Sequence, residues 1–148
     1  MSTNSDFEQL FSTMMQLGKL MSKQTHETRE EQTATMLQLM ALQFLKEYPN
    51  GTVSDLANFL KLSKSSTTQL VERLVKVESV ERINDTEDRR IIRLNITENG
   101  QNEYIALKKK LMDKMQKIFS KIPTKDIREL IRIHTNLIET LKKEQHEQ

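Results

Sequence analysis

The chain has 148 residues, of which 36% are hydrophobic and 30% charged, and it contains only three glycines and two prolines. So few chain breakers favour helices over a turn-rich β-protein. Cysteine is absent, which excludes disulfides, thiolate metal ligands and a thiol redox switch. The formal net charge of +2 does not by itself indicate nucleic-acid binding, so a binding face of that kind requires a local arrangement of charges.

No segment predicts export or membrane insertion. Residues 1–6 are polar and lack a basic stretch followed by an apolar run. No apolar run approaches the roughly 18 residues that a membrane-spanning helix needs. We therefore expect a cytoplasmic protein that does not bind membranes, and the length fits a single domain, residues 1–148.

The first part of the chain predicts two helices. Apolar residues at helical spacing indicate a helix over residues 7–23, and the polar stretch 22–34 indicates its end and a linker. Thr35 is expected to cap a second helix, which must end at Pro49 because proline cannot continue the hydrogen-bond ladder. A very short strand is expected at residues 52–53.

Two shorter helices and a tight turn come next. Ser54 is expected to cap a third helix over residues 55–61, and Ser63 to cap a fourth over residues 64–77. Leu62 lies in the turn between them. This arrangement predicts a helix-turn-helix.

The remainder predicts a β-hairpin and two long helices. Residues 80–84 and 91–96 indicate two strands joined by an acidic turn. A long helix follows Gly100 and ends at Pro123, and Thr124 is expected to cap the last helix. The fold class is therefore mainly α with a small β-hairpin wing, in the layout of a winged helix-turn-helix.

The fourth helix presents polar side chains that suit the major groove of DNA. Glutamine can pair bidentately with adenine, and serine or threonine hydroxyls can contact bases or phosphates. A solvated helix end, with serine and threonine as ordinary caps, is the alternative. The side chains expected to point outward are Lys64, Ser65, Ser66, Thr68, Gln69 and Arg73.

Residues 88–100 carry a longer motif, Asp-Arg-Arg, five residues, then Ile-Thr-Glu-Asn-Gly. The motif resembles the pattern Asp-x-Arg-x5-Leu-Thr-x-x-Gly of the MarR family of bacterial and archaeal transcription regulators, with Ile96 in place of leucine. The resemblance extends to Thr35-x-x-Gln38-Leu39-x-x-Leu42 in the second helix. It implies a winged helix-turn-helix lobe over residues 35–100.

The resemblance also implies roles on the wing. Arg90 would enter the minor groove, Asp88 would orient it through an ion pair, and Arg89 would lie near backbone phosphates. A narrow minor groove concentrates negative potential and so favours an inserted arginine. A surface salt bridge is the alternative for Asp88 and Arg90.

The turn after the fourth helix departs from the family. Relatives usually have glycine and then leucine where this chain has Glu78 and Ser79. A glycine there supplies a left-handed helix cap at little cost. We therefore expect Glu78 to strain or shift this turn.

Apolar stripes on residues 7–23 and 101–144 are too extensive for the core of a small winged helix. The resemblance implies that these terminal helices of two subunits intertwine in a homodimer, although packing within one subunit must explain part of the stripes. A two-fold dimer would place its recognition helices about 34 Å apart and read a pseudo-palindromic operator. The candidate interface residues are Phe7, Leu10, Phe11, Ile127, Leu130, Ile131, His134, Leu137, Ile138 and Leu141.

The resemblance further implies a small aromatic or anionic effector that changes the spacing of the two DNA-binding heads. Met14, Met40 and Phe44 are candidates to line its cavity, because methionine adapts to irregular ligands. Core packing is the alternative, and it is favoured for each of the three residues taken singly.

Metal and catalytic sites have little support. His26, His134 and His146 are scattered, and no phosphate-binding loop or nucleophile motif is present, so we expect neither a cofactor nor an enzyme. The sequence predicts a sequence-specific duplex-DNA-binding regulator, most simply a repressor. The alternatives are a winged-helix module that binds a protein, favoured by the acidic residues beside the wing, and a metal-dependent sensor.

Overall fold

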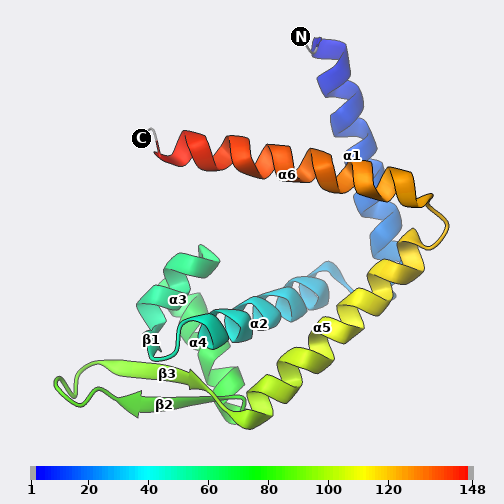
Figure 1. Cartoon of the computed structure of the whole chain (residues 1–148). Helices are drawn as coiled ribbons and strands as arrows, with labels where there is room; N and C mark the ends of the chain where they lie inside the picture. Colours follow the sequence, from blue (N-terminus) through cyan, green and yellow to red (C-terminus); the bar gives the residue numbers. More distant parts are fainter. Residues whose placement is uncertain (1–2, 147–148) are drawn as a thin grey trace. The chain divides into compact units, whose positions relative to one another are not determined.

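The computed structural model describes residues 3–146, which form six helices and a small three-stranded sheet (Figure 1). This architecture confirms the predicted fold class. In chain order the elements are α1 (Asn4–Gln24), α2 (Arg29–Glu47), β1 (Gly51–Thr52), α3 (Val53–Leu60), α4 (Lys64–Lys76), β2 (Val80–Asn84), β3 (Ile92–Ile96), α5 (Glu98–Phe119) and α6 (Thr124–His146).

The chain divides into two compact units, one ending at Leu111 and the other beginning at Met112. The first contains α1 to β3 and the beginning of α5, and the second contains the rest of α5 and α6. The predicted sub-regions, a DNA-binding lobe over residues 35–100 and dimerisation helices over residues 7–23 and 101–144, stay a prediction.

The core of the first unit lies between α2, α3, α4 and the sheet. Its largest fully buried side chains include Leu42 of α2, Leu56 of α3, Leu74 of α4 and Leu94 of β3. Burial of each leucine contributes roughly 1.5–3 kcal/mol relative to an exposed one. These contacts fix the outward faces of α4 and the hairpin relative to one another.

The sheet is antiparallel, with strand order β1-β3-β2. Gly51 lies opposite Leu94, and the hairpin register places Val80 opposite Ile96. Val80 and Leu94 are buried, whereas the turn end of the hairpin extends away from the core.

The predicted cap of the second helix is wrong. Thr35 lies inside α2, where its hydroxyl donates to the Glu31 carbonyl at 2.9 Å. The helix begins earlier, because Thr28 and Glu31 form a reciprocal capping box. The apolar periodicity starts only later in the helix, so the polar first turns resembled a linker.

The predicted starts of the third and last helices also shift. Thr52, not Ser54, caps α3, because Asp55 accepts a hydrogen bond from the Thr52 amide at 2.9 Å in a second capping box. Thr124 is the first residue of α6, and the carbonyl of Pro123 accepts from the amide of Ile127. Elsewhere the boundaries differ by a few residues at most.

Candidate nucleic-acid interface

The fourth helix, α4, has one buried face and one exposed polar face. Thr67, Leu70, Val71 and Leu74 are buried against the core. Of the predicted contact residues, Thr68 is half-buried and the others are exposed: Lys64, Ser65, Ser66, Gln69 and Arg73. The structure therefore brings all six together on one helix with polar or charged side chains directed away from the core.

The start of α4 has a defined hydrogen-bond pattern. Ser63 caps the helix as predicted, because its Oγ accepts from the Ser66 amide at 3.0 Å. The Ser63 hydroxyl also donates to Ser66 Oγ at 2.9 Å, and the Thr68 hydroxyl donates to the Lys64 carbonyl at 2.8 Å. Thr68 can therefore offer DNA only acceptor lone pairs in this arrangement, whereas Gln69 and Lys64 keep exposed donors.

The turn between α3 and α4 depends on one left-handed residue. Lys61 caps α3 with φ of 55°, and the Leu62 amide donates back to the Ala57 carbonyl at 3.1 Å. The chain can thus reverse direction within three residues, Lys61 to Ser63, before α4 begins. This short turn holds the two helices close enough for Leu60 and Leu70 to share the core.

At the tip of the wing, Asp88 holds Arg90 with both carboxylate oxygens. Arg90 Nε and Nη2 donate to Asp88 Oδ1 and Oδ2, each at 3.0 Å, and the Arg90 amide donates to Oδ1 at the same distance. The hydrogen bonds from Arg90 lower the pKa of Asp88, and Asp88 raises the pKa of Arg90. The Arg90 side chain is nonetheless 89% exposed, so the pair fixes its direction without covering it.

A second carboxylate, Asp85, organises the loop beneath that pair. Its Oδ2 accepts from the amides of Glu87 at 3.1 Å and Asp88 at 3.0 Å, and its Oδ1 accepts from Arg93 Nε at 3.1 Å. The Asp88 amide is the main cause of the lowered pKa of Asp85, followed by the Arg93 side chain. Asp85 therefore positions the residue that in turn positions Arg90.

Arg93 also links the wing to the turn before β1. Its Nη1 donates to the Asn50 carbonyl at 3.3 Å, and Asn95 Nδ2 donates to Asn50 Oδ1 at 3.0 Å. Asn95 Oδ1 accepts from the Asn50 amide at 2.8 Å. Sequence reasoning missed Asp85, Arg93 and Asn50. The register that pairs Ile83 with Arg93 is the signal that places Arg93 beside the loop, and it needs the folded hairpin.

Comparison with known proteins finds a family likeness in this part of the chain. The MarR family model matches residues 34–92, which span α2 to the beginning of β3. We refer to residues 34–92, the segment that this family model matches, as the MarR-family domain.

Curated relatives of this domain come from Bacillus subtilis strain 168. YsmB, named an uncharacterized HTH-type transcriptional regulator, is 29% identical over 89 residues, covering 60% of this chain and 61% of YsmB. MdtR, named an HTH-type transcriptional repressor, is 33% identical over 89 residues, covering 58% of this chain and 57% of MdtR. The chain thus spans about six-tenths of the length of these relatives.

The fold likeness extends further than the sequence likeness. The crystal structure of YusO from Bacillus subtilis superposes with a TM-score of 0.72 at 22% identity, covering 94% of this chain and 99% of YusO. The terminal helices outside the MarR-family domain therefore also belong to a known architecture.

The terminal helices expose the apolar residues that we expected at a dimer interface. On α1, Phe7, Leu10 and Phe11 are 59%, 55% and 67% exposed. On α6, Ile127 is half-buried and the other predicted residues are exposed: Leu130, Ile131, His134, Leu137, Ile138 and Leu141. The His134 ring lies against its own helix, with Nδ1 2.7 Å from the Leu130 carbonyl oxygen.

The three candidate effector residues lie in different environments. Phe44 is buried, with its ring centroid 5.0 Å from that of Phe59 and 5.1 Å from that of Tyr48. Met40 packs against the same core, whereas Met14 on α1 is 62% exposed. Phe44 thus has a packing role in this structure, and an effector cavity at these residues stays a prediction.

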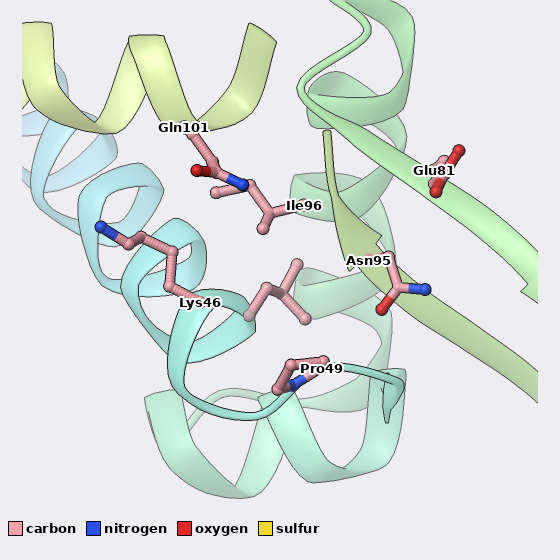
Figure 2. Close-up of a pocket in the computed structure, with 7 residues that line it drawn as sticks. Lys46, Pro49, Glu81, Asn95, Ile96 and Gln101 are labelled. Atoms are coloured by element: carbon pink, nitrogen blue, oxygen red, sulfur yellow. The ribbon is translucent and has the colours of Figure 1, made fainter. Parts of the chain in front are cut away.

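Among the described residues, two of the surface cavities lie elsewhere in the first unit. The larger, about 480 Å³, lies between the end of α2, the strands and the start of α5 (Figure 2). Its lining residues are Leu45, Lys46, Pro49, Glu81, Asn95, Ile96 and Gln101. The second, about 360 Å³, is lined by Arg29, Glu30, Thr33, Ala34, Leu37 and Arg73. Neither contains Met14, Met40 or Phe44.

Two further features of the described residues bear on function. Within residues 3–146, no group of three or more histidine or carboxylate side chains is placed to hold a metal ion. No helix in that part of the chain is both long and apolar enough to cross a membrane.

Proposed function

We propose that this chain is a sequence-specific duplex-DNA-binding transcription regulator. The observation that carries the proposal is the orientation of the Arg90 side chain. Asp88 holds it through two side-chain hydrogen bonds, and yet the side chain is 89% exposed. An exposed ion pair stabilises a fold by only ~0–1 kcal/mol, so stability alone does not explain three hydrogen bonds at a loop tip. A preorganised arginine at this place suits the negative potential of a narrow minor groove.

The exposed face of α4 supplies the second part of the interface. Gln69 can donate to and accept from adenine in the major groove, and Lys64 and Arg73 can contact phosphates. Ser65 and Ser66 lie at the start of the helix, where the positive end of the helix dipole also favours a phosphate. Both parts belong to the MarR-family domain, whose relatives YsmB and MdtR carry names of transcription regulators.

The active species in this proposal is a homodimer. The exposed apolar side chains of α1 and α6 form faces that water disfavours, and large faces of this kind mark interaction sites. A two-fold dimer carries two copies of α4 and two wings, and so reads a pseudo-palindromic operator. In this proposal the protein represses transcription, as the name of MdtR states for that relative. A small aromatic or anionic effector then releases the protein from its operator.

Selection of the purified protein against a random duplex library tests this function. We expect an enriched inverted repeat with half-sites about 10 base pairs apart, and an affinity that falls steeply with salt. Absence of enrichment, with only weak salt-dependent binding, would instead support the protein-interaction alternative.

The variant Arg90→Ala separates the wing from general charge effects. We expect it to lower operator affinity by about tenfold or more, since one base-groove contact is worth ~1–3 kcal/mol. Arg89→Ala is the matched control, because it removes the same charge from the adjacent exposed residue without disturbing the Asp88 pair. Equal losses for both variants would show that only charge, and not the pose of Arg90, matters.

A further inference from the structure

Hydrogen bonds join the turn that follows α4, residues 77–79, to the start of α5. The Thr97 amide donates to the Ser79 carbonyl at 3.1 Å, and the Thr97 hydroxyl donates to the Glu78 carbonyl at 2.6 Å. Asn99 Nδ2 donates to the Val77 carbonyl at 3.0 Å. Three consecutive carbonyls after the recognition helix are thus satisfied by the segment that begins α5.

The two segments are also in close steric contact. Gly100 is buried, and a β-carbon there would overlap the backbone carbonyl of Ser79 and lie 2.8 Å from Cγ1 of Ile96. The absence of a side chain at Gly100 therefore permits the backbone of the turn to approach the α5 helix.

A polar side-chain network crosses the same contact. Ser79 is fully buried, and its hydroxyl donates to one carboxylate oxygen of Glu103 on α5. The other oxygen of Glu103 accepts from the side-chain Nε2 of Gln38 on α2. Glu103 is half-buried and is the shared partner of both groups. A buried hydroxyl without its partner costs about 1–3 kcal/mol, so the network favours one arrangement of the three elements.

We propose that Glu103 is a positioning residue that fixes the recognition helix α4 relative to α5 through Ser79, and relative to α2 through Gln38. Apolar contacts tolerate small sliding and rotation, whereas a hydrogen bond to a carboxylate weakens steeply with misalignment. Loss of Glu103 leaves the apolar core intact but widens the range of α4 orientations. The consequence for operator recognition rests on the proposed DNA-binding function, whereas the geometric statement does not.

Distance measurement between spin labels tests the geometry without DNA. The chain has no native cysteine, so Glu72→Cys on α4 and Ala106→Cys on α5, both at exposed positions, provide a unique labelled pair. Labelled protein is diluted with unlabelled protein, so that only distances within one chain contribute. We expect a narrow distribution in the parent and a broader or shifted one in Glu103→Ala.

Glu98→Ala is the matched control, because it removes the same charge from the exposed start of the same helix. A distribution unchanged in Glu103→Ala, or equally broadened in Glu98→Ala, overturns the proposal. If Glu103→Ala does not fold, Ser79→Ala removes only the donor hydroxyl. Broadening in Ser79→Ala then supports the proposal, and an unchanged distribution overturns it.

Measurement of DNA affinity adds a quantity that a change in protein stability alone does not alter. The measurement is made under conditions well below the unfolding midpoint. We expect Glu103→Ala to lower affinity for the selected operator about tenfold, which is the equivalent of one base contact. Affinity for a scrambled duplex should stay constant. Restoration of most of the loss by Glu103→Gln, which keeps hydrogen-bonding atoms, supports positioning. If the parent protein enriches no duplex, the proposed function fails, and the spin-label distances still decide whether Glu103 fixes α4.

Discussion

At the scale of single residues, carboxylates rather than burial fix the wing. Asp85 holds the Asp88 amide, and Asp88 holds the Arg90 guanidinium, in a short chain of charge-assisted hydrogen bonds. The resemblance predicted the interaction between Asp88 and Arg90. It did not predict the hydrogen bond from the Asp88 amide to Asp85, because Asp85 lies in a turn whose acidic residues all look equivalent in the sequence.

The lowered pKa values of Asp85 and Asp88 predict a pH window for wing order. A carboxyl whose folded pKa is lowered contributes stability above its unfolded pKa, ordinarily 3.8, and loses that contribution as the pH falls through the folded pKa. We therefore expect the ordered wing to persist as the pH falls to about 4 and to loosen below it. Carboxyl-carbon NMR titration measures both residues.

Arg90→Ala provides the control for that titration. The pKa of Asp88 should rise toward its ordinary value in this variant, since Arg90 is the main cause of its lowering. The pKa of Asp85 should remain lowered, because its main causes are the Asp88 amide and Arg93. An unshifted Asp88 would contradict the ion pair as the source of the effect.

The expectation that Glu78 strains the turn after α4 agrees with its backbone. Glu78 has φ of 59°, in the left-handed region, and the Glu78 and Ser79 amides donate back to the Val75 and Leu74 carbonyls, both at 2.9 Å. This is the Schellman arrangement, in which glycine is preferred. The turn is therefore not shifted by glutamate. Its effect is a cost in conformational free energy at Glu78.

We therefore predict that Glu78→Gly stabilises the protein by about 1 kcal/mol, because a non-glycine residue in the left-handed region costs roughly 1–2 kcal/mol. Chemical denaturation monitored by circular dichroism measures the change. Glu78→Ala, which keeps the β-carbon, separates the backbone effect from loss of the charge. A gain of the same size in Glu78→Ala would assign the effect to the charge.

At the scale of elements, the cap of α4 was predictable from the sequence, whereas the caps of α2 and α3 were not. Ser63 immediately precedes α4 and was identified correctly. Thr28 precedes two polar helical turns, and the apolar pattern that begins after Thr35 therefore favours the later start. The network of Ser79, Glu103 and Gln38 had no sequence signal, because its members lie 24 and 65 positions apart and meet only after α2, α4 and α5 have packed.

The contact between the α4–β2 turn and α5 predicts a large cost for Gly100→Ala. The added methyl group meets backbone, which cannot rotate away, so the turn or the helix must shift. We expect a loss of about 1–3 kcal/mol or more in the free energy of unfolding. Gly18→Ala on α1 is the control, because a β-carbon added there meets no neighbouring atom within 4 Å and alanine favours a helix. Equal effects of the two substitutions would contradict the close contact.

At the scale of the whole molecule, the composition of the terminal helices implies association. A single chain leaves Phe7, Phe11 and Leu137 more than half exposed. The sequence predicted these faces from their periodicity. It could not specify their pairing, since any second apolar face of similar length satisfies the same pattern.

We predict that Phe11→Glu weakens the homodimer. Each phenylalanine contributes about 1.5–3 kcal/mol when buried and occurs twice per dimer, so the dissociation constant should rise by roughly a hundredfold or more. Analytical ultracentrifugation across a concentration series measures it. Gln9→Glu, the control, adds the same charge to an exposed polar position of α1. A dissociation constant unchanged by Phe11→Glu would exclude this face from the interface.

The threonine capping boxes at the starts of α1, α2 and α3 have a consequence for the order of folding. Each box closes within four residues, Thr3 to Asp6, Thr28 to Glu31 and Thr52 to Asp55, so these helix starts can form before any distant segment arrives. The strand pair β1–β3 instead joins Gly51 to Leu94, across a long loop whose closure costs chain entropy. We expect the helices to gain protection from hydrogen exchange early in refolding, and the sheet that supports the wing to be completed last.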